Sequence, residues 1–166
     1  TRFKCDWSSD VCSSDLDEAA SQALVREFEE LTLESDELCI DELTKLAVKH
    51  KHLSGKLLWF PAKDAASDSE RKFLLCARAL LLGKLKGAEF IRISTSGSPL
   101  TVHTNDFTDA DGVRALRAEL AKLLKIDVKS LTFKPEVFST LGIYRDNRFG
   151  IKPSLYDDQK EFVWPG

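Results

Sequence analysis

The stretch FKPEVFSTLGIYRDNRFGIKPSLY, residues 133–156, holds aromatic, basic and turn-forming residues more densely than any other part of the chain. Two prolines and two glycines divide it into short pieces, which we interpret as extended. Within it, YRDNRF at 144–149 is predicted to be the tip of a hairpin, because Asp and Asn tolerate the backbone conformations of tight turns. The chain is therefore expected to continue there as short antiparallel strands joined by tight turns.

The same stretch contains the candidate ligand-binding residues. Aromatic rings stack on nucleobases and the planar forks of Arg pair with phosphates, so a basic hairpin with interleaved rings suits RNA or a nucleotide. In the alternative interpretation, which composition alone favours, alternate rings face a core and the charges form a solvated rim. The candidates are Lys134, Tyr144, Arg145, Asn147, Arg148, Phe149, Lys152 and Tyr156. The cations among them would neutralise phosphates, while Tyr144 and Phe149 would offer stacking surfaces.

Apolar residues at helical and strand spacings predict the rest of the secondary structure. Helices are predicted over 17–33, 35–51, about 67–82 and from 107 onward, and strands over 56–60, 89–95 and 100–104. This mixed order, with short turns between the last strands, predicts an α+β domain. We expect one curved antiparallel sheet with about three helices packed on one of its faces.

Individual side chains in these elements also have expected positions. Side chains alternate along a strand, so Phe90 and Arg92 should share one face of the strand at 89–95. Thr108 is expected to cap the helix that begins near residue 107. The helix at about 67–82 is expected to bury Phe73, Leu74, Ala77, Leu80 and Leu81.

Charge is distributed unevenly along the chain. Residues 1–42 hold 3 basic and 13 acidic side chains, a net charge of −10, whereas residues 43–152 hold 20 basic and 11 acidic ones, a net charge of +9. An acidic leader on a basic domain suits a polyanion ligand, although an acidic extension also serves simply to increase solubility.

The chain divides into three expected segments. The first sixteen residues lack hydrophobic periodicity, and DWSSDVCSSDL at 6–16 resembles a translated sequencing adapter, so we interpret 1–16 as an artefactual or disordered leader. Residues 17–36 form an acidic, helical extension, and residues 37–166 form a single domain. The absence of any methionine fits a fragment whose true start is missing.

Cysteine usage bears on the cellular compartment. Excluding the leader leaves Cys39 and Cys76, each within a predicted helix and without CxxC spacing. That pattern indicates buried thiols in a reducing compartment rather than a disulfide framework or a zinc site. The sequence also contains no long apolar run that could cross a membrane, so we expect a protein that does not enter a membrane. We expect it in the cytoplasm and, in one alternative, also in the nucleus.

Catalytic and metal-binding motifs are not found in the sequence. There is no HExxH and no GxSxG, and His50 and His52 are too close in sequence to share one helical face. Gly83 and Gly87 follow a helix, whereas a phosphate-binding loop precedes one. We therefore expect no enzyme activity, no cofactor and no metal. A small hydrolase or transferase whose groups converge only in space remains an alternative.

Three stretches together resemble the basophilic-leukaemia-expressed protein family: FKPEVF with LGIYRDNRFGIKPSLY, CIDELTKLAVKHKHLSGKLLWF at 39–60, and VHTNDFTDADGV at 102–113. The resemblance spans about residues 39–156. It implies the fold of the cap-binding translation initiation factor 4E, with a concave face open to a ligand. That factor holds its methylated guanine between two tryptophans. Here Trp59 is expected in a core strand and Trp164 near the chain end, so a matching pair is not expected.

Two functional hypotheses follow. The first is a non-enzymatic intracellular domain that binds RNA or a nucleotide on a basic, aromatic concave face. It predicts that Lys134, Arg145, Arg148 and Lys152 surround one concavity. The second is a protein–protein interaction module without nucleic-acid binding, which predicts an exposed apolar patch on the helices.

Overall fold

A computed structural model of the chain describes residues 15–34, 38–61 and 66–155. Residues 1–14 of the predicted leader, Tyr156 and Trp164 lie outside these ranges, so the predictions for them are not tested by the structure. Residues 17–34 and most of the predicted domain lie within these ranges.

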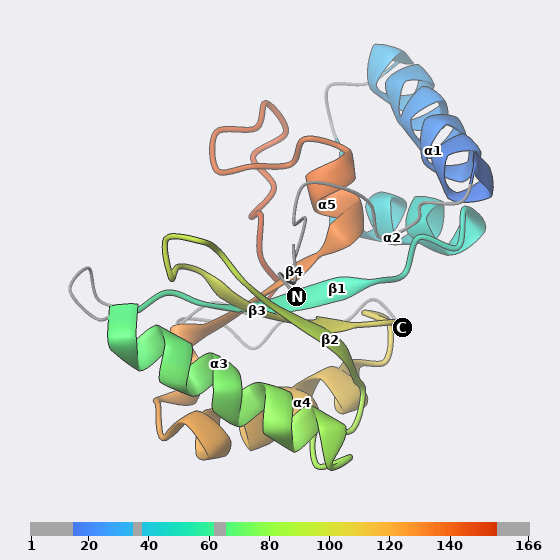
Figure 1. The fold of residues 1–166 in the computed structure, drawn as a ribbon. Coiled ribbons are helices and arrows are strands. Elements are labelled where there is room, and N and C mark those ends of the chain that lie inside the picture. The colour runs from blue at the N-terminus through green and yellow to red at the C-terminus, as the bar shows by residue number, and fades with distance from the viewer. Residues whose placement is uncertain (1–14, 35–37, 62–65, 156–166) are drawn as a thin grey trace, which may run out of the picture.

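Within the described residues, four antiparallel strands form one open sheet in the order β2-β3-β1-β4 (Figure 1). The strands are β1 Gly55–Trp59, β2 Ala88–Ile93, β3 Leu100–Thr104 and β4 Leu131–Pro135. The first three coincide closely with the predicted strands, and β4 begins just before the stretch that starts at residue 133. The expected α+β class with one antiparallel sheet is confirmed.

Helices lie on both sides of this sheet, so the prediction that they pack on one face is wrong. They are α1 Asp15–Glu34, α2 Ile40–Lys49, α3 Ala66–Leu81, α4 Ala110–Leu124 and α5 Glu136–Thr140, with a short 3-10 helix at Val128–Ser130. Figure 1 shows α3 and α4 on one side of the sheet, and α1, α2 and α5 on the other. Thus α3 and α4 cover the apolar face, while α5 borders the opposite face beside β1 and β4.

The alternation of side chains along the strands separates these two faces. Leu57 pairs with Phe133 on one side and Val102 on the other, and all three are almost fully buried in the core. On the same face, the Lys72 amine of α3 lies 4.7 Å from the centre of the Trp59 ring. Burial of these large apolar side chains is the main force that holds α3 and α4 on the sheet.

Helix α3 is rotated from the orientation that its leucines predict. Its inward positions are Ser69, Lys72, Cys76 and Ala79, all buried, whereas Leu74 is 65% exposed and Leu81 88% exposed. Lys72 is tolerated in the interface because its amine pairs with Asp68 one turn earlier and lies over an aromatic ring. The expectation that Leu74 and Leu81 face the core is therefore wrong.

The stretch at 133–156 forms a strand end, a short helix and a series of turns, and no strand is assigned between 141 and 155. Pro135 ends β4 and serves as the N-cap of α5, where Glu136 is favourable beside the helix N-terminus. The predicted hairpin tip at 144–149 is wrong. Asn147 holds this loop together, because its amide nitrogen donates to the carbonyls of Tyr144 and Ile151, both at 2.6 Å.

Two helix starts also differ from the expectation. Cys39 is the N-cap of α2 and exposed rather than buried within a helix, and its backbone N–H donates to the Glu42 carboxylate at 2.9 Å. Cys76 is buried as expected, and burial raises the pKa of its thiol to about 12.

Helix α4 is capped by Asp109 rather than Thr108, because the Asp109 carboxylate accepts from the Gly112 N–H at 3.0 Å.

Gly55 is required by the packing of β1 against β4. A Cβ at this position would lie 3.1 and 3.2 Å from Cε2 and Cε1 of Phe133, and closer still to Cζ. We expect Gly55→Ala to lower the free energy of unfolding by about 1–3 kcal/mol, because the buried ring has no room to retreat. Urea denaturation measures the change. In a Phe133→Leu background the same substitution should cost clearly less; an equal cost would contradict the steric explanation.

Candidate ligand-binding site

The face of the sheet opposite α3 and α4 carries polar and basic side chains. In register across all four strands, Phe90 lies beside His103, His103 beside Lys56, and Lys56 beside Lys134. A second row on the same face contains Arg92, Thr101, Leu58 and Thr132. We call these eight residues the polar sheet face.

Two lysines on neighbouring strands are the electrostatic centre of this face. Lys56 and Lys134 stand directly opposite each other, an arrangement that is unfavourable for like charges. Glu136, at the start of α5, accepts from the Lys56 amine at 3.1 Å through one oxygen, and its other oxygen lies 2.9 Å from the same amine. The Lys134 amine lies 4.0 Å from the centre of the Tyr144 ring. Burial, and next the charge of Lys56, lowers the pKa of Lys134, so its ammonium gains from a nearby anion.

A ring stack forms the β2 end of the row. The rings of Phe90 and His103 are parallel to within 15° and their centroids are 4.0 Å apart. His103 is 7% exposed, whereas Phe90 is 40% exposed. Nε2 of His103 lies 3.3 Å from the Thr101 hydroxyl. Burial lowers the pKa of His103 to about 4, so its imidazole is neutral at pH 7.

The charges of the polar sheet face do not balance. Lys56, Lys134 and Arg92 are three cations, Glu136 is one carboxylate, and His103 is neutral, which leaves a net charge of +2. Arg92 is exposed, Lys56 and Lys134 are partly buried, and Tyr144 borders the group with an exposed ring. Partly desolvated cations attract an anion more strongly than fully hydrated ones, so this arrangement favours an anionic ligand.

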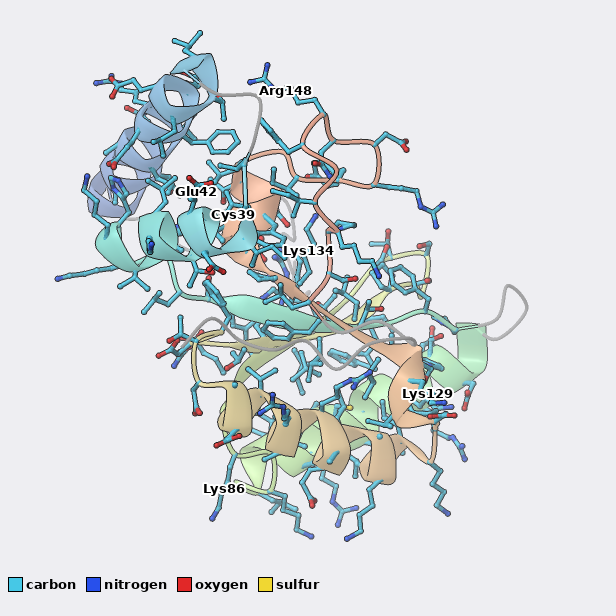
Figure 2. All side chains as sticks on the ribbon, turned by 180° about the vertical axis from the view of Figure 1, so that it is seen from behind. Cys39, Glu42, Lys86, Lys129, Lys134 and Arg148 are labelled. Carbon is cyan, nitrogen blue, oxygen red and sulfur yellow. The ribbon has the colours of Figure 1, made fainter. Side chains whose placement is uncertain are left out.

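The residues predicted from the sequence are not gathered around one concavity. Figure 2 shows Lys134 at the sheet beneath α5, and Arg148 beside α1. The Arg148 guanidinium donates to the Thr32 carbonyl of α1 at 3.4 Å. Phe149 packs edge-on against Phe28 of α1, with ring centroids 5.8 Å apart. Phe149 therefore contributes to the contact between this loop and α1. Of the predicted residues that the structure describes, only Lys134 and Tyr144 meet at the polar sheet face.

The remaining predicted residues that the structure describes lie in or near the turns. Asn147 uses its side chain to close the loop, as described above. Arg145 and Lys152 are exposed on the same loop. Their role in ligand binding stays a prediction.

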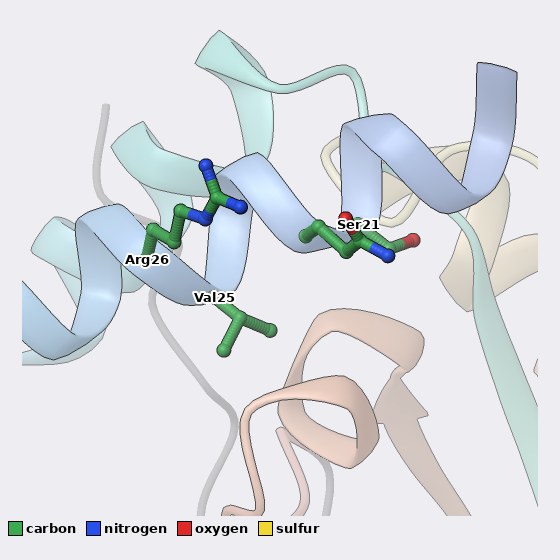
Figure 3. A pocket seen from close by; sticks show the side chains of 4 residues that line it. Ser21, Val25 and Arg26 are labelled. Atoms are coloured by element: carbon green, nitrogen blue, oxygen red, sulfur yellow. The ribbon is translucent and has the colours of Figure 1, made fainter.

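A concave surface occurs on α1. Ser21, Gln22, Val25 and Arg26 line a depression along this helix (Figure 3). With one cation among these lining residues and no aromatic ring, it lacks the combination of charges and rings found on the polar sheet face.

Other kinds of site find no support in the part of the chain that the structure describes. Among residues 15–34, 38–61 and 66–155, no three His, Cys, Asp or Glu side chains are grouped to hold a metal ion. No helix within the same ranges has the length and apolar character needed to cross a bilayer. No protein-family model matches the sequence.

Seven of the eight members of the polar sheet face were not among the candidates from the sequence, and they include its other charged or aromatic residues, Lys56, Phe90, Arg92 and His103. Strand alternation correctly placed Phe90 and Arg92 on one face, which was the available signal. The sequence pattern does not show which strands pair with each other, and it is this pairing that brings residues 56, 90, 103 and 134 into one row.

The lowered pKa of His103 predicts a pH dependence of stability. The His103 imidazole takes up a proton near pH 6.5 in the unfolded chain but only near pH 4 in the folded chain. The contribution of His103 to the free energy of unfolding is therefore full above pH 6.5 and is lost as the pH falls towards 4. The loss attributable to His103 is at most about 3 kcal/mol.

Urea denaturation between pH 7 and pH 4 should show a shallower pH dependence of the free energy of unfolding for His103→Asn than for the unsubstituted chain. Equal slopes would contradict the burial of a neutral imidazole. Because burial also lowers the pKa of His52, part of the slope remains in the variant.

Proposed function

We propose that the protein binds single-stranded RNA or a nucleotide on the polar sheet face and performs no catalysis there. The observation that carries this proposal is the row of Phe90, His103, Lys56 and Lys134 across the four strands, with an unbalanced positive charge beside exposed aromatic rings. Phosphates are recognised by cations and bases by rings, and few other ligands use both together.

Each group has a distinct task in this proposal. Lys134 and Arg92 pair with phosphates directly. Lys56 is already paired with Glu136 and contributes when an anionic ligand competes with that carboxylate. Arg145, Arg148 and Lys152 on the loop add positive charge that attracts the polyanion towards the site.

The state of His103 supports binding rather than catalysis. It lies under Phe90, its Nε2 contacts Thr101, and its pKa is about 4. A general base at neutral pH needs a pKa near 7 and direct access to the substrate, and His103 has neither. It therefore supports the ring above it instead of reacting.

The open antiparallel sheet, covered on one face by α3 and α4, is compatible with the proposed initiation-factor-4E-like fold and with the proposed membership of the basophilic-leukaemia-expressed protein family. In this proposal the ligand face is the polar sheet face, opposite α3 and α4. Trp59 lies on the other face of β1, so it is not part of the binding surface.

Fluorescence-anisotropy titration of the full chain with a short labelled single-stranded RNA tests this function. Lys134→Ala and Arg92→Ala should each weaken binding by about 1 kcal/mol, or roughly fivefold in Kd, because each removes one phosphate contact. Each should also reduce the slope of log K against log salt by about 0.7.

Lys86→Ala and Lys129→Ala are the matched controls, because both lysines are exposed on the side of α3 and α4 (Figure 2). They remove the same charge from the wrong face and should leave both Kd and salt slope nearly unchanged. Equal losses for all four variants would indicate unspecific attraction and contradict the site. No binding by folded protein would contradict the function.

A second candidate function rests on the exposed leucines of α3. Leu74, Leu75, Leu81 and Leu82 are all exposed on or just after this helix. Exposed apolar side chains that lie close together mark sites of protein association. In this candidate, Leu74→Ser/Leu81→Ser would weaken association with a protein partner in cross-linking experiments while leaving RNA binding unchanged.

A further inference from the structure

We propose that the outward face of the Phe90 ring is a stacking platform for one unpaired nucleobase, so that the site selects single-stranded ligands over duplexes. This inference rests on the proposed function and identifies the part of the polar sheet face that contacts a base rather than a phosphate.

A register irregularity in β2 places Phe90 on this face. Ala88 pairs with Thr104 and Phe90 with His103, so Glu89 is an extra residue between two successive pairs. Without that extra residue, Glu89 would stand beside His103 and Phe90 would join the buried face with Val102. A bulge of this kind re-aims the side chains that follow it, and here it puts a large apolar ring on a polar surface.

The environment of Phe90 fits a platform better than it fits a core residue. One face of its ring lies on the His103 ring, with centroids 4.0 Å apart, and the side chain is 40% exposed. His103 is itself held by contact with Thr101. The Phe90 ring is therefore supported from below and open to solvent, and a base can stack on it without prior rearrangement of the site.

The surrounding charges give the ligand a direction. Arg92 is two residues along the same strand and so about 7 Å away, while Lys56 lies two strands from Phe90, about 10 Å away. A base on Phe90 thus leaves its phosphates near Arg92 or towards Lys56 and Lys134. Bases inside a duplex are covered on both faces by their neighbours, so only an unpaired or terminal base can use this ring.

The test compares two strands of equal length and phosphate count, one with bases and one abasic. The full chain should bind the base-bearing strand about 5- to 150-fold more tightly than the abasic strand, the range expected for stacking of one base. A duplex of the same sequence should bind no better than the abasic strand at equal phosphate concentration.

Phe90→Leu keeps an apolar cover over His103 but removes the aromatic face, and Phe90→Trp enlarges that face. We expect Phe90→Leu to abolish the preference for bases while leaving abasic binding unchanged, and Phe90→Trp to retain it. Leu82→Ala, on the α3 side, is the control and should behave like the unsubstituted chain. Thermal denaturation confirms that each variant is folded.

The outcomes separate the inference from the function on which it rests. Tight binding of both strands by the unsubstituted chain, or an equal base preference in Phe90→Leu, would overturn the platform and leave the phosphate site intact. Failure of the unsubstituted, folded chain to bind either strand would overturn the proposed function and the platform together.

Discussion

The antiparallel register of the four strands is the constraint on which the rest of the structure depends. Because side chains alternate, one register places Leu57, Val102 and Phe133 in the core and, at the same time, Lys56, His103 and Lys134 on the opposite face. A slip of one residue in any pair would exchange the two sets and bury lysines against α3 and α4. The steric demand of Phe133 for a glycine at position 55 fixes the pairing of β1 and β4, and the irregularity in β2 sets the faces of Phe90 and the residues that follow it. The core and the polar sheet face are thus two consequences of one arrangement.

The loop after α5 connects this sheet to α1. Near its start, Tyr144 lies over the Lys134 amine, and near its end the Leu155 N–H donates to the Phe133 carbonyl of β4 at 2.9 Å. Between them, Phe149 packs on Phe28 of α1. Helix α1 is in turn attached to α2 through Glu27, whose carboxylate lies 2.6 Å from the Lys49 amine and 2.8 Å from His50 Nε2. Hydrogen bonds from these two residues lower the pKa of Glu27. Because its carboxylate is only partly buried, this ion pair contributes little, and most of the attachment comes from the apolar contacts of α1. Arg148 and Phe149 of the loop therefore contribute to the contact with α1, whereas Tyr144 lies beside the polar sheet face.

Sequence patterns predicted the parts of the structure that local chemistry controls. Strands β1, β2 and β3 were predicted because each is a short apolar or alternating run bounded by glycine or proline. The rotation of α3 was not, because its inward face contains Ser69 and Lys72, and Lys72 is accommodated by Asp68 and Trp59, contacts that leucine periodicity does not show. Residues 144–149 were predicted to be a hairpin tip because Asp146 and Asn147 favour turns, whereas the actual shape of this loop depends on three hydrogen bonds of the Asn147 side chain. Among the residues that the structure describes, the sequence identified Lys134 and Tyr144 of the candidate site. Its other members are brought together by strand pairing between positions 56 and 132 of the chain.

In the proposed function, the polar sheet face contacts the ligand, and α3 and the loop at 144–149 do not. A nitrogen-15 NMR titration of the full chain with a short single-stranded RNA tests it most directly, because every backbone amide reports separately. The largest shift changes should occur at Lys56, Phe90, His103 and Lys134 on four different strands, with small changes along α3. Changes confined to α3, or to the loop arginines without the strands, would contradict this account of the site.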